Sequence, residues 1–313
     1  MNEIGGYFEL EEFHGKEYYD GLIALNNARS ALHYIIEARN YKRIYIPYYL
    51  CGSIAKKLEK INVEYSFYHV NSNMIPELNK EIDDDEVVYI VNYYGQIDNN
   101  KIKNLKDKYK NLIVDDVQAF FQRPLPGTDT FYSCRKFFGV PDGAYLSIDK
   151  KIDRELSEDK SIMRMSHLLG RYENSASAFY EDFRINDSSF DNDSIMMMSA
   201  LSHNLLRGID YEYVEIRRKE NFECLHSALH KLNKLDIENG LFAYPLMMDD
   251  AARIRKHLIN KKIYVPVLWP DYDVGANDIE KSFINNILPL PIDQRYGREE
   301  MEYMIGEIQN CIN

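Results

Sequence analysis

The sequence predicts an α/β protein with a largely parallel sheet, followed by a smaller α+β domain. Strand-like apolar runs alternate with helical segments through the first two thirds of the chain. Several of these runs are apolar on both faces, as strands covered by helices on both sides must be. Beyond about residue 194 the pattern changes to longer helices around short strands. We therefore expect a large domain at 1–193 and a small domain at 194–313.

The expected elements of the large domain follow from periodicity. Leu32, Ile35 and Ile36 recur at helical spacing. Short runs rich in β-branched and aromatic residues read as strands. In chain order, we expect a helix at 31–38, a strand at 43–49, a helix at 53–61, strands at 64–70 and 87–95, a helix at 101–109 and a strand at 111–121. Because most strands are separated by helices, right-handed crossovers and a parallel sheet follow.

The small domain is expected to open with one long amphipathic helix. Its apolar residues recur at steps of three and four: Met198, Leu201, Leu205, Ile209, Tyr213 and Ile216. Further expected elements are strands at 241–248, 263–269 and 286–293 and helices at 249–262 and 297–312. The polar stretch 174–194 predicts a flexible surface loop.

Composition narrows the classes of function. The net charge of −12 argues against a nucleic-acid partner or a general membrane-binding surface. The four cysteines lie far apart without metal-ligand spacing, which is typical of reduced thiols in a cytoplasmic protein. No basic segment leads into an apolar one at the N-terminus, and no apolar run reaches membrane-spanning length. We expect no export and no membrane anchor.

Polar residues gather where predicted strands end, which is where open parallel sheets place their ligand sites. The turn before residue 31 suits a bound phosphate through free helix N–H groups, or is an ordinary helix cap by Asn27 or Ser30. Asp115 could hold a cationic nitrogen or a metal, or could cap a helix. Tyr93 could flank a planar ring, or could be a simple strand-end aromatic.

Lys136 stands between an aromatic run and a Pro-Asp-Gly turn, in what the sequence indicates to be packed interior. A lone lysine on a loop usually points to water. Here it follows a phosphate-suited helix start and a strand-end aspartate, which is the order expected for a pyridoxal phosphate site. We therefore expect Lys136 to be buried because it is bonded to a cofactor.

At these residues the chain resembles the DegT-type nucleotide-sugar aminotransferases, which are fold type I pyridoxal phosphate enzymes with an aspartate aminotransferase-like architecture. The resemblance covers nearly the whole chain in the order of its elements. It rests on "NARSAL" at the phosphate turn, Pro47 at a strand end, "DDVQA" from Asp115, "TFYSCRKFFGVPDGAYL" around Lys136, and "LPLPID" before the closing helix. The match from Asp115 to Ala119 is the strongest of these.

The resemblance implies a function for each matching residue. Lys136 would form the Schiff base and carry the proton, and Asp115 would hold the pyridine nitrogen. The implied cofactor contacts are Gln118 on the ring, and the backbone of Ala28, Arg29 and Ser30 with Ser133 or Thr130 on the phosphate.

The sequence also departs from the family's pattern. Arg29 stands where the family has threonine, and Cys51 occupies the position of the aromatic that stacks on the cofactor ring. Tyr48, Tyr49 or Tyr93 would then have to stack instead. The spacing between serine and lysine is shifted by one residue, which leaves Ser133 and Thr130 as alternatives.

The implied reaction is transamination of a nucleotide-linked keto-sugar with glutamate as the amino donor, in a homodimer with a shared active site. Dehydratases of the family replace the lysine, so Lys136 favours transamination. A second interpretation is a degenerate member that binds cofactor or sugar nucleotide without catalysis. A third, a metal-dependent sugar enzyme, is weaker because no His or Glu lies near Asp115 and Asp116 in the sequence. We expect no metal site.

Overall fold

The computed structural model describes residues 4–191, 194–270 and 275–312. Its main sheet has eight strands in the order β1-β8-β7-β6-β5-β2-β3-β4. The strands are β1 (Ile23–Leu25), β2 (Arg43–Pro47), β3 (Glu64–Val70), β4 (Pro76–Glu77), β5 (Glu86–Val91), β6 (Leu112–Asp115), β7 (Asp129–Ser133) and β8 (Ala144–Ser147). The central strands from β3 to β7 pair in parallel, and the edge pairs are antiparallel. The predicted α/β class is confirmed.

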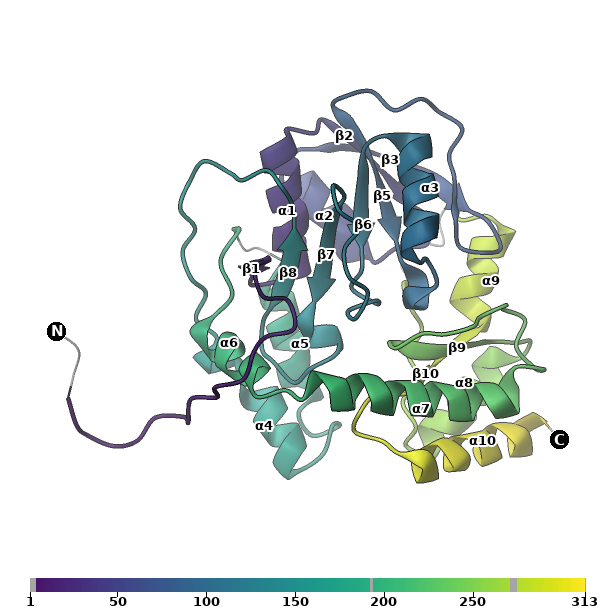
Figure 1. Ribbon diagram of the computed structural model, residues 1–313. Helices are drawn as coiled ribbons and strands as arrows, with labels where there is room; N and C mark the ends of the chain where they lie inside the picture. Colours follow the sequence, from purple (N-terminus) through teal and green to yellow (C-terminus); the bar gives the residue numbers. More distant parts are fainter. Residues whose placement is uncertain (1–3, 192–193, 271–274, 313) are drawn as a thin grey trace.

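Helices cover both faces of this sheet (Figure 1). α1 (Ala28–Arg39) and α2 (Gly52–Lys60) lie on one face, and α3 (Asn99–Tyr109) lies on the other. Every residue of β5 is buried, as its apolar sequence on both faces requires. The strands predicted at 43–49, 64–70, 87–95 and 111–121 are all present, although three of them end earlier than expected, where the chain turns away at the carboxyl edge.

The C-terminal part contains a second, two-stranded antiparallel sheet of β9 (Ala243–Met247) and β10 (Ile287–Pro291). α7 (Tyr211–Leu229), α8 (Ala251–Asn260) and α10 (Arg298–Ile312) pack around it, and α9 (Asp278–Asn286) precedes β10. Most buried apolar residues of α7, α8, α10, β9 and β10 form their own cluster, whereas Phe283 and Ile284 of α9 belong to the cluster of the main sheet. The division at residues 193 and 194 stays a proposal.

The predicted long helix after residue 198 is two helices, so that prediction was wrong. α6 (Ala200–Arg207) ends at Gly208, and α7 begins after Asp210, whose side chain accepts a hydrogen bond from the Tyr213 N–H at 3.0 Å. The apolar stripe does not continue past the break, because Tyr213 and Ile216 are half exposed. A helix cap therefore interrupted a periodic pattern.

Two other predicted elements are also corrected. The stretch 174–194 contains α5 (Tyr180–Ser189), which packs against α4 (Ser166–Glu173); residues 192 and 193 lie outside the described part. At Gly170 the ring of Phe179 approaches so closely that a Cβ would lie 2.3 Å from it, so this helix pair needs glycine there. The expected strand at 263–269 is absent from the described residues, where Pro266 removes a backbone donor.

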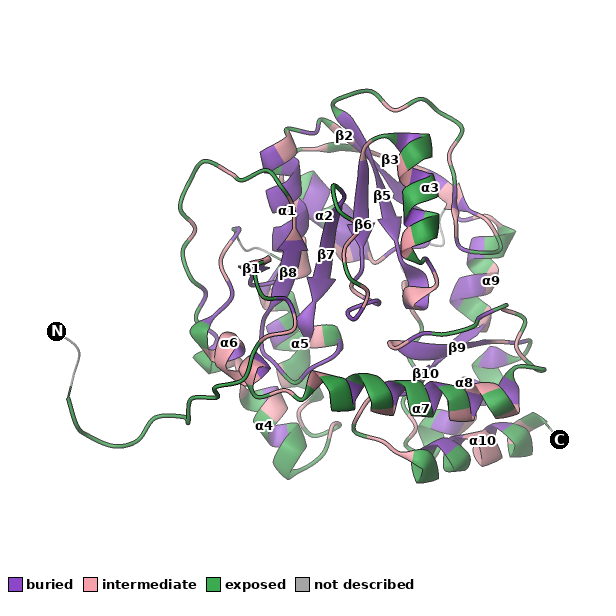
Figure 2. Ribbon diagram, in the orientation of Figure 1, coloured by how far each residue is buried: buried purple, intermediate pink, exposed green. Residues whose placement is uncertain are grey.

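The described residues also form the short 3-10 turns η1 (Tyr93–Gly95), η2 (Cys134–Lys136) and η3 (Ile162–Arg164). The first described residues run away from the body of the molecule (Figure 1). They are exposed, whereas the central sheet is almost wholly buried (Figure 2). Among the described residues, no helix is both long enough and apolar enough to cross a bilayer.

Candidate functional site

The candidate residues meet at the carboxyl edge of the parallel sheet. Asp115 ends β6 and is paired with Phe131 of β7, whose last residue is Ser133. Lys136 closes the turn η2 that follows. The N–H of Gly143, at the end of the loop carrying Lys136, donates to the carbonyl of Asn26 at 2.6 Å. The aspartate, the lysine and the start of α1 are therefore brought together.

Asp115 is a buried acid with neutral hydrogen-bond donors. The phenol of Tyr89 donates to one carboxylate oxygen, and the backbone N–H of Val117 donates to the other at 3.0 Å. Within the described part of the chain no cationic side chain pairs with it. Burial raises the pKa of Asp115 to about 6, while the two hydrogen bonds and the nearby charge of Lys136 oppose the rise. A protonated ring nitrogen would supply the missing countercharge.

Lys136 is exposed, so the expectation of a buried lysine was wrong for the unliganded chain. Its neighbours Cys134 and Phe137 are buried, and the tight turn projects the lysine outward while they pack inward. Its ammonium makes no hydrogen bond or ion pair with any other described residue. The amine is thus accessible to a small molecule at the sheet edge.

The start of α1 combines a helix cap with available amides. Asn27 Oδ1 accepts from the N–H of Ser30 at 2.9 Å, and Ser30 Oγ donates to Asn26 Oδ1 at 2.7 Å. Among the described residues no acceptor is in place for the N–H groups of Ala28 and Arg29, the first two of the helix. The helix-cap interpretation is confirmed for Asn27. Phosphate binding stays a prediction, and the cap leaves two N–H donors that an anion could use.

Arg29 does not point freely toward such an anion. Its guanidinium pairs with Asp191 and donates to the carbonyl of Asp187 at 3.1 Å. Arg135 and Arg164 join it around the ring of Phe190, at 4.9 and 4.8 Å from the ring centroid against 6.0 Å for Arg29. The sequence reasoning missed this arginine cluster, because its members come from distant segments.

The remaining predicted cofactor contacts lie at or near the carboxyl edge of the sheet, apart from Thr130. Gln118 is buried and accepts from the N–H of Tyr94 at 2.7 Å. Ser133 lies at the carboxyl end of β7, whereas Thr130 lies deeper in the strand and donates to the Thr128 carbonyl at 3.4 Å. Cys51 precedes α2 at the same edge, half-buried, with its sulfur 3.2 Å from Ser53 Oγ. Ser133 therefore lies nearer the carboxyl edge than Thr130, and the contact of either hydroxyl with a phosphate stays a prediction.

None of the tyrosines considered for stacking on the ring is free to do so in this structure. Tyr93 is buried, donates to the Tyr49 carbonyl, and stacks on the Tyr49 ring at 5.1 Å. Tyr48 stacks between Phe67 and His69 at 4.7 Å from each. A planar cofactor would therefore need a stacking partner other than these tyrosines. Cys51 occupies the position where the resemblance expects an aromatic ring.

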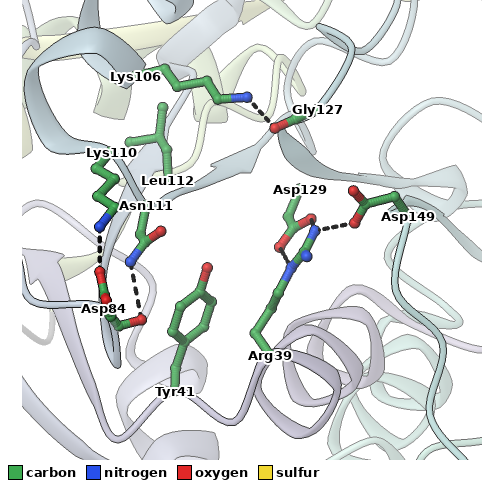
Figure 3. A pocket seen from close by; sticks show the side chains of 10 residues that line it. All are labelled: Arg39, Tyr41, Asp84, Lys106, Lys110, Asn111, Leu112, Gly127, Asp129 and Asp149. Carbon is green, nitrogen blue, oxygen red and sulfur yellow. Dashed lines mark hydrogen bonds and ion pairs between the residues drawn. The ribbon is translucent and has the colours of Figure 1, made fainter.

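Two pockets in the described part of the chain lie away from the candidate residues. One, of about 270 Å³, is at the amino edge of the sheet, where Arg39 pairs with Asp129 and Asp149 and where Lys110 pairs with Asp84 (Figure 3). The other, of about 300 Å³, lies beside α9 and β9. Neither is lined by a predicted site residue. In the first, the other charged side chains form ion pairs and Lys106 donates to the Gly127 carbonyl.

Sequence reasoning did not identify Tyr89, the donor to Asp115. The two residues are brought together by the pairing of β5 with β6, which sets Val91 opposite Asp115 and puts Tyr89 on the same face as Val91. This register is not readable from one sequence. Asp116 turns away and accepts from Asn92 Nδ2 at 2.9 Å. The described residues contain no group of three or more His, Cys, Asp or Glu placed to hold a metal.

No protein-family model matches the chain, and no curated protein does. Solved structures do. A DegT DnrJ EryC1 StrS aminotransferase from Brucella abortus matches with a TM-score of 0.62 at 14% identity, over 93% of this chain and 86% of that one. The chain has the fold of these sugar aminotransferases. The expected fold type I of pyridoxal phosphate enzymes is thereby confirmed.

Two more structures of this fold bear on ligands. NtdA from Bacillus subtilis, solved with bound cofactor PMP, matches with a TM-score of 0.66 at 12% identity, over 95% of this chain and 74% of that one. DesI, solved in the presence of its TDP-sugar product, matches with a TM-score of 0.61 at 13% identity, over 92% and 80%. At these identities the likeness shows the fold.

Proposed function

We propose that the protein is a pyridoxal phosphate-dependent aminotransferase acting on a keto-sugar. The observation that carries the proposal is that a buried carboxylate without an ion-pair partner, Asp115, and an accessible lysine, Lys136, lie at the same edge of the sheet. The fold supports it, because a protein of the same fold was solved with bound PMP.

The chain's own residues would each do a defined task. The cofactor supplies an electron sink for the carbanion that forms at the amino-acid carbon. Asp115 would hold a proton on the ring nitrogen, and Lys136 would bind the aldehyde carbon and then move a proton as a neutral amine. The N–H groups of Ala28 and Arg29 and the hydroxyl of Ser133 would bind the phosphate.

We further propose a nucleotide-linked substrate, glutamate as amino donor and a cytoplasmic homodimer. The TDP-sugar product of DesI supports a nucleotide-linked sugar. The exposed position of Lys136 supports a second copy that closes the site, because catalysis needs water excluded from the reacting atoms.

The test is incubation of the purified protein with pyridoxal phosphate, borohydride reduction and peptide mapping. We expect a visible absorbance band and a pyridoxyl adduct on Lys136, both lost in Lys136→Ala. Lys151→Ala is the control, because Lys151 is also exposed but lies away from the sheet edge, after β8. An adduct spread over many surface lysines, or unchanged by Lys136→Ala, would contradict the proposal.

A second candidate is a protein of this fold that binds a sugar nucleotide without catalysis. It is favoured by the packing of Tyr48, Tyr49 and Tyr93, none of which is free to cover a cofactor ring, and by the pairing of Arg29 with Asp191. Saturable binding of a TDP-sugar, together with absence of the Lys136 adduct, would favour it over the enzyme.

A further inference from the structure

Arg218 of α7 is a fully buried arginine that makes no ion pair within the described part of the chain. Its side chain is 2% exposed. Asp293, the acid whose charge acts on Arg218, is held by Arg295 through two hydrogen bonds of 2.6 and 2.8 Å. Burial lowers the pKa of Arg218 to about 10, and the charge of Asp293 opposes that fall. A buried cation without a carboxylate is costly, and an apolar side chain could fill the same space.

One hydrogen bond of Arg218 reaches the residue after Lys136, and its partner Gln294 bonds to the same residue. Its Nη2 donates to the carbonyl of Phe137 at 3.2 Å, and the guanidinium lies 4.5 Å from the centre of the Phe137 ring. Gln294 Nε2 donates to the same carbonyl at 2.8 Å, while Gln294 Oε1 accepts from Arg218 Nε at 2.8 Å. The three groups form a closed triangle around one backbone carbonyl.

The opposite end of the same loop is fixed by the start of α6 and by Asn26, which precedes α1. Asp142 is fully buried and accepts from Ser199 N and Oγ at 2.9 and 2.6 Å, and from Ser202 Oγ. Gly143 donates to Asn26. The loop from 134 to 143 is thus held at both ends, and the hold near Lys136 comes from α7 and from the segment after β10.

We propose that Arg218, with Gln294, is a positioning residue that fixes the loop carrying Lys136 against the C-terminal part of the chain. Arg218 contacts neither Lys136 nor Asp115, and it acts through the Phe137 carbonyl. A further donor of Arg218, Nη1, bonds to the Leu241 carbonyl at 2.6 Å. The segment that leads into β9 is therefore held by the same guanidinium. Any movement of α7 or of the β9–β10 sheet would then be transmitted to the lysine.

Hydrogen exchange in the cofactor-free protein tests this directly. The N–H groups of Phe138 and Val140 are bonded within the loop, to the carbonyls of Cys134 and Phe138. In Arg218→Met we expect them to exchange about tenfold faster, with the amides of α3 unchanged. The control is Arg217→Met, which alters the next residue of the same helix and removes a surface pair with Glu220. Equal exchange in the two variants, or an increase spread through α3, would overturn the proposal.

A second variant keeps the test decisive if Arg218→Met does not fold. Gln294→Leu keeps the Arg218 side chain but removes one donor to the Phe137 carbonyl and the acceptor of Arg218 Nε. We expect faster exchange at Phe138 and Val140, smaller than for Arg218→Met but above the control. Wild-type exchange in folded Gln294→Leu would overturn the proposal equally.

The link to catalysis rests on the proposed function and has its own readout. The pH midpoint of pyridoxyl adduct formation on Lys136 should shift in Arg218→Met and stay unchanged in Arg217→Met. If the wild-type protein forms no adduct, the proposed function fails while the exchange experiment still decides whether Arg218 holds the loop. If the adduct forms and its midpoint is the same in both variants, Arg218 supports the fold without positioning Lys136.

Discussion

Asp115 makes the stability of the cofactor-free protein depend on pH. Burial raises its pKa from an ordinary 3.8 to about 6. The folded protein therefore holds the proton more tightly than the unfolded chain, and the stability that Asp115 contributes is full below about pH 4 and lost as the pH rises through about 6. Above that pH the buried carboxylate costs roughly 3 kcal/mol, at 1.36 kcal/mol for each pKa unit.

Asp115→Asn should therefore stabilise the cofactor-free protein at neutral pH. We expect the free energy of unfolding to rise by roughly 1 to 3 kcal/mol at about pH 7.5, with the difference from wild type falling away toward about pH 4. Urea unfolding across this range measures it. Asp107→Asn, at an exposed position of α3, is the control. A variant equally or less stable at neutral pH would show that Asp115 has a countercharge in the protein.

The residues of the candidate site differ in how far the sequence could predict them. Asp115 was placed correctly at a strand end, because an apolar run closing in an acid is visible in one sequence. Tyr89 depends on the register between two strands, and the exposure of Lys136 depends on how one turn projects its side chains. Both require three-dimensional packing that periodicity does not encode.

At the scale of elements, specific residues end α6 and begin α7 within a stretch whose apolar spacing is helical throughout. Gly208 closes α6, and Asp210 caps α7 by accepting from the Tyr213 N–H. The break gives α7 its own direction, which carries Arg218 to the Phe137 carbonyl. Removal of the cap should therefore weaken α7 at its start and loosen that contact.

Asp210→Ala should lower the free energy of unfolding by about 1 kcal/mol, the usual cost of losing a helix cap. Asp210→Asn should keep most of the stability, since its amide oxygen can accept the same hydrogen bond. Thermal and urea unfolding of the two variants measure the difference. If both variants lose the same stability, the carboxylate acts through charge and not as a cap.

The buried central strands were predictable and the helix ends were not, for a physical reason. A run such as 87–91 is apolar on both faces wherever it occurs in a covered sheet, so its type follows from composition. A helix end depends on single residues, and the continuous spacing from Met198 to Ile216 concealed the cap at Asp210. Likewise α5 is held by contacts outside itself, including Asn186 Nδ2 donating to the Pro141 carbonyl at 3.0 Å.

At the scale of the whole molecule, the helix pair α4–α5 exposes large apolar side chains. They are Leu169, Tyr172, Tyr180, Phe183 and Ile185. The inner side of α5 contacts the site, because Asp187 binds Arg135 at 3.1 Å. A second copy seated on this face would lie next to the loop carrying Lys136 and would cover both the apolar residues and the exposed lysine. This face suits the proposed homodimer better than α7, which exposes few apolar residues.

Charge introduced into this face should separate the homodimer. We expect wild-type protein at about micromolar concentration to have about twice the chain mass of 36.9 kDa by light scattering, and Tyr172→Glu with Ile185→Glu to have the chain mass. Tyr303→Glu makes the same change at a half-exposed residue of α10 and should leave the dimer intact. A monomeric wild type would refute the homodimer, whereas a dimeric double variant would move the interface elsewhere. If the partner completes the site, pyridoxyl adduct formation on Lys136 should slow in the monomeric variant and remain at the wild-type rate in Tyr303→Glu.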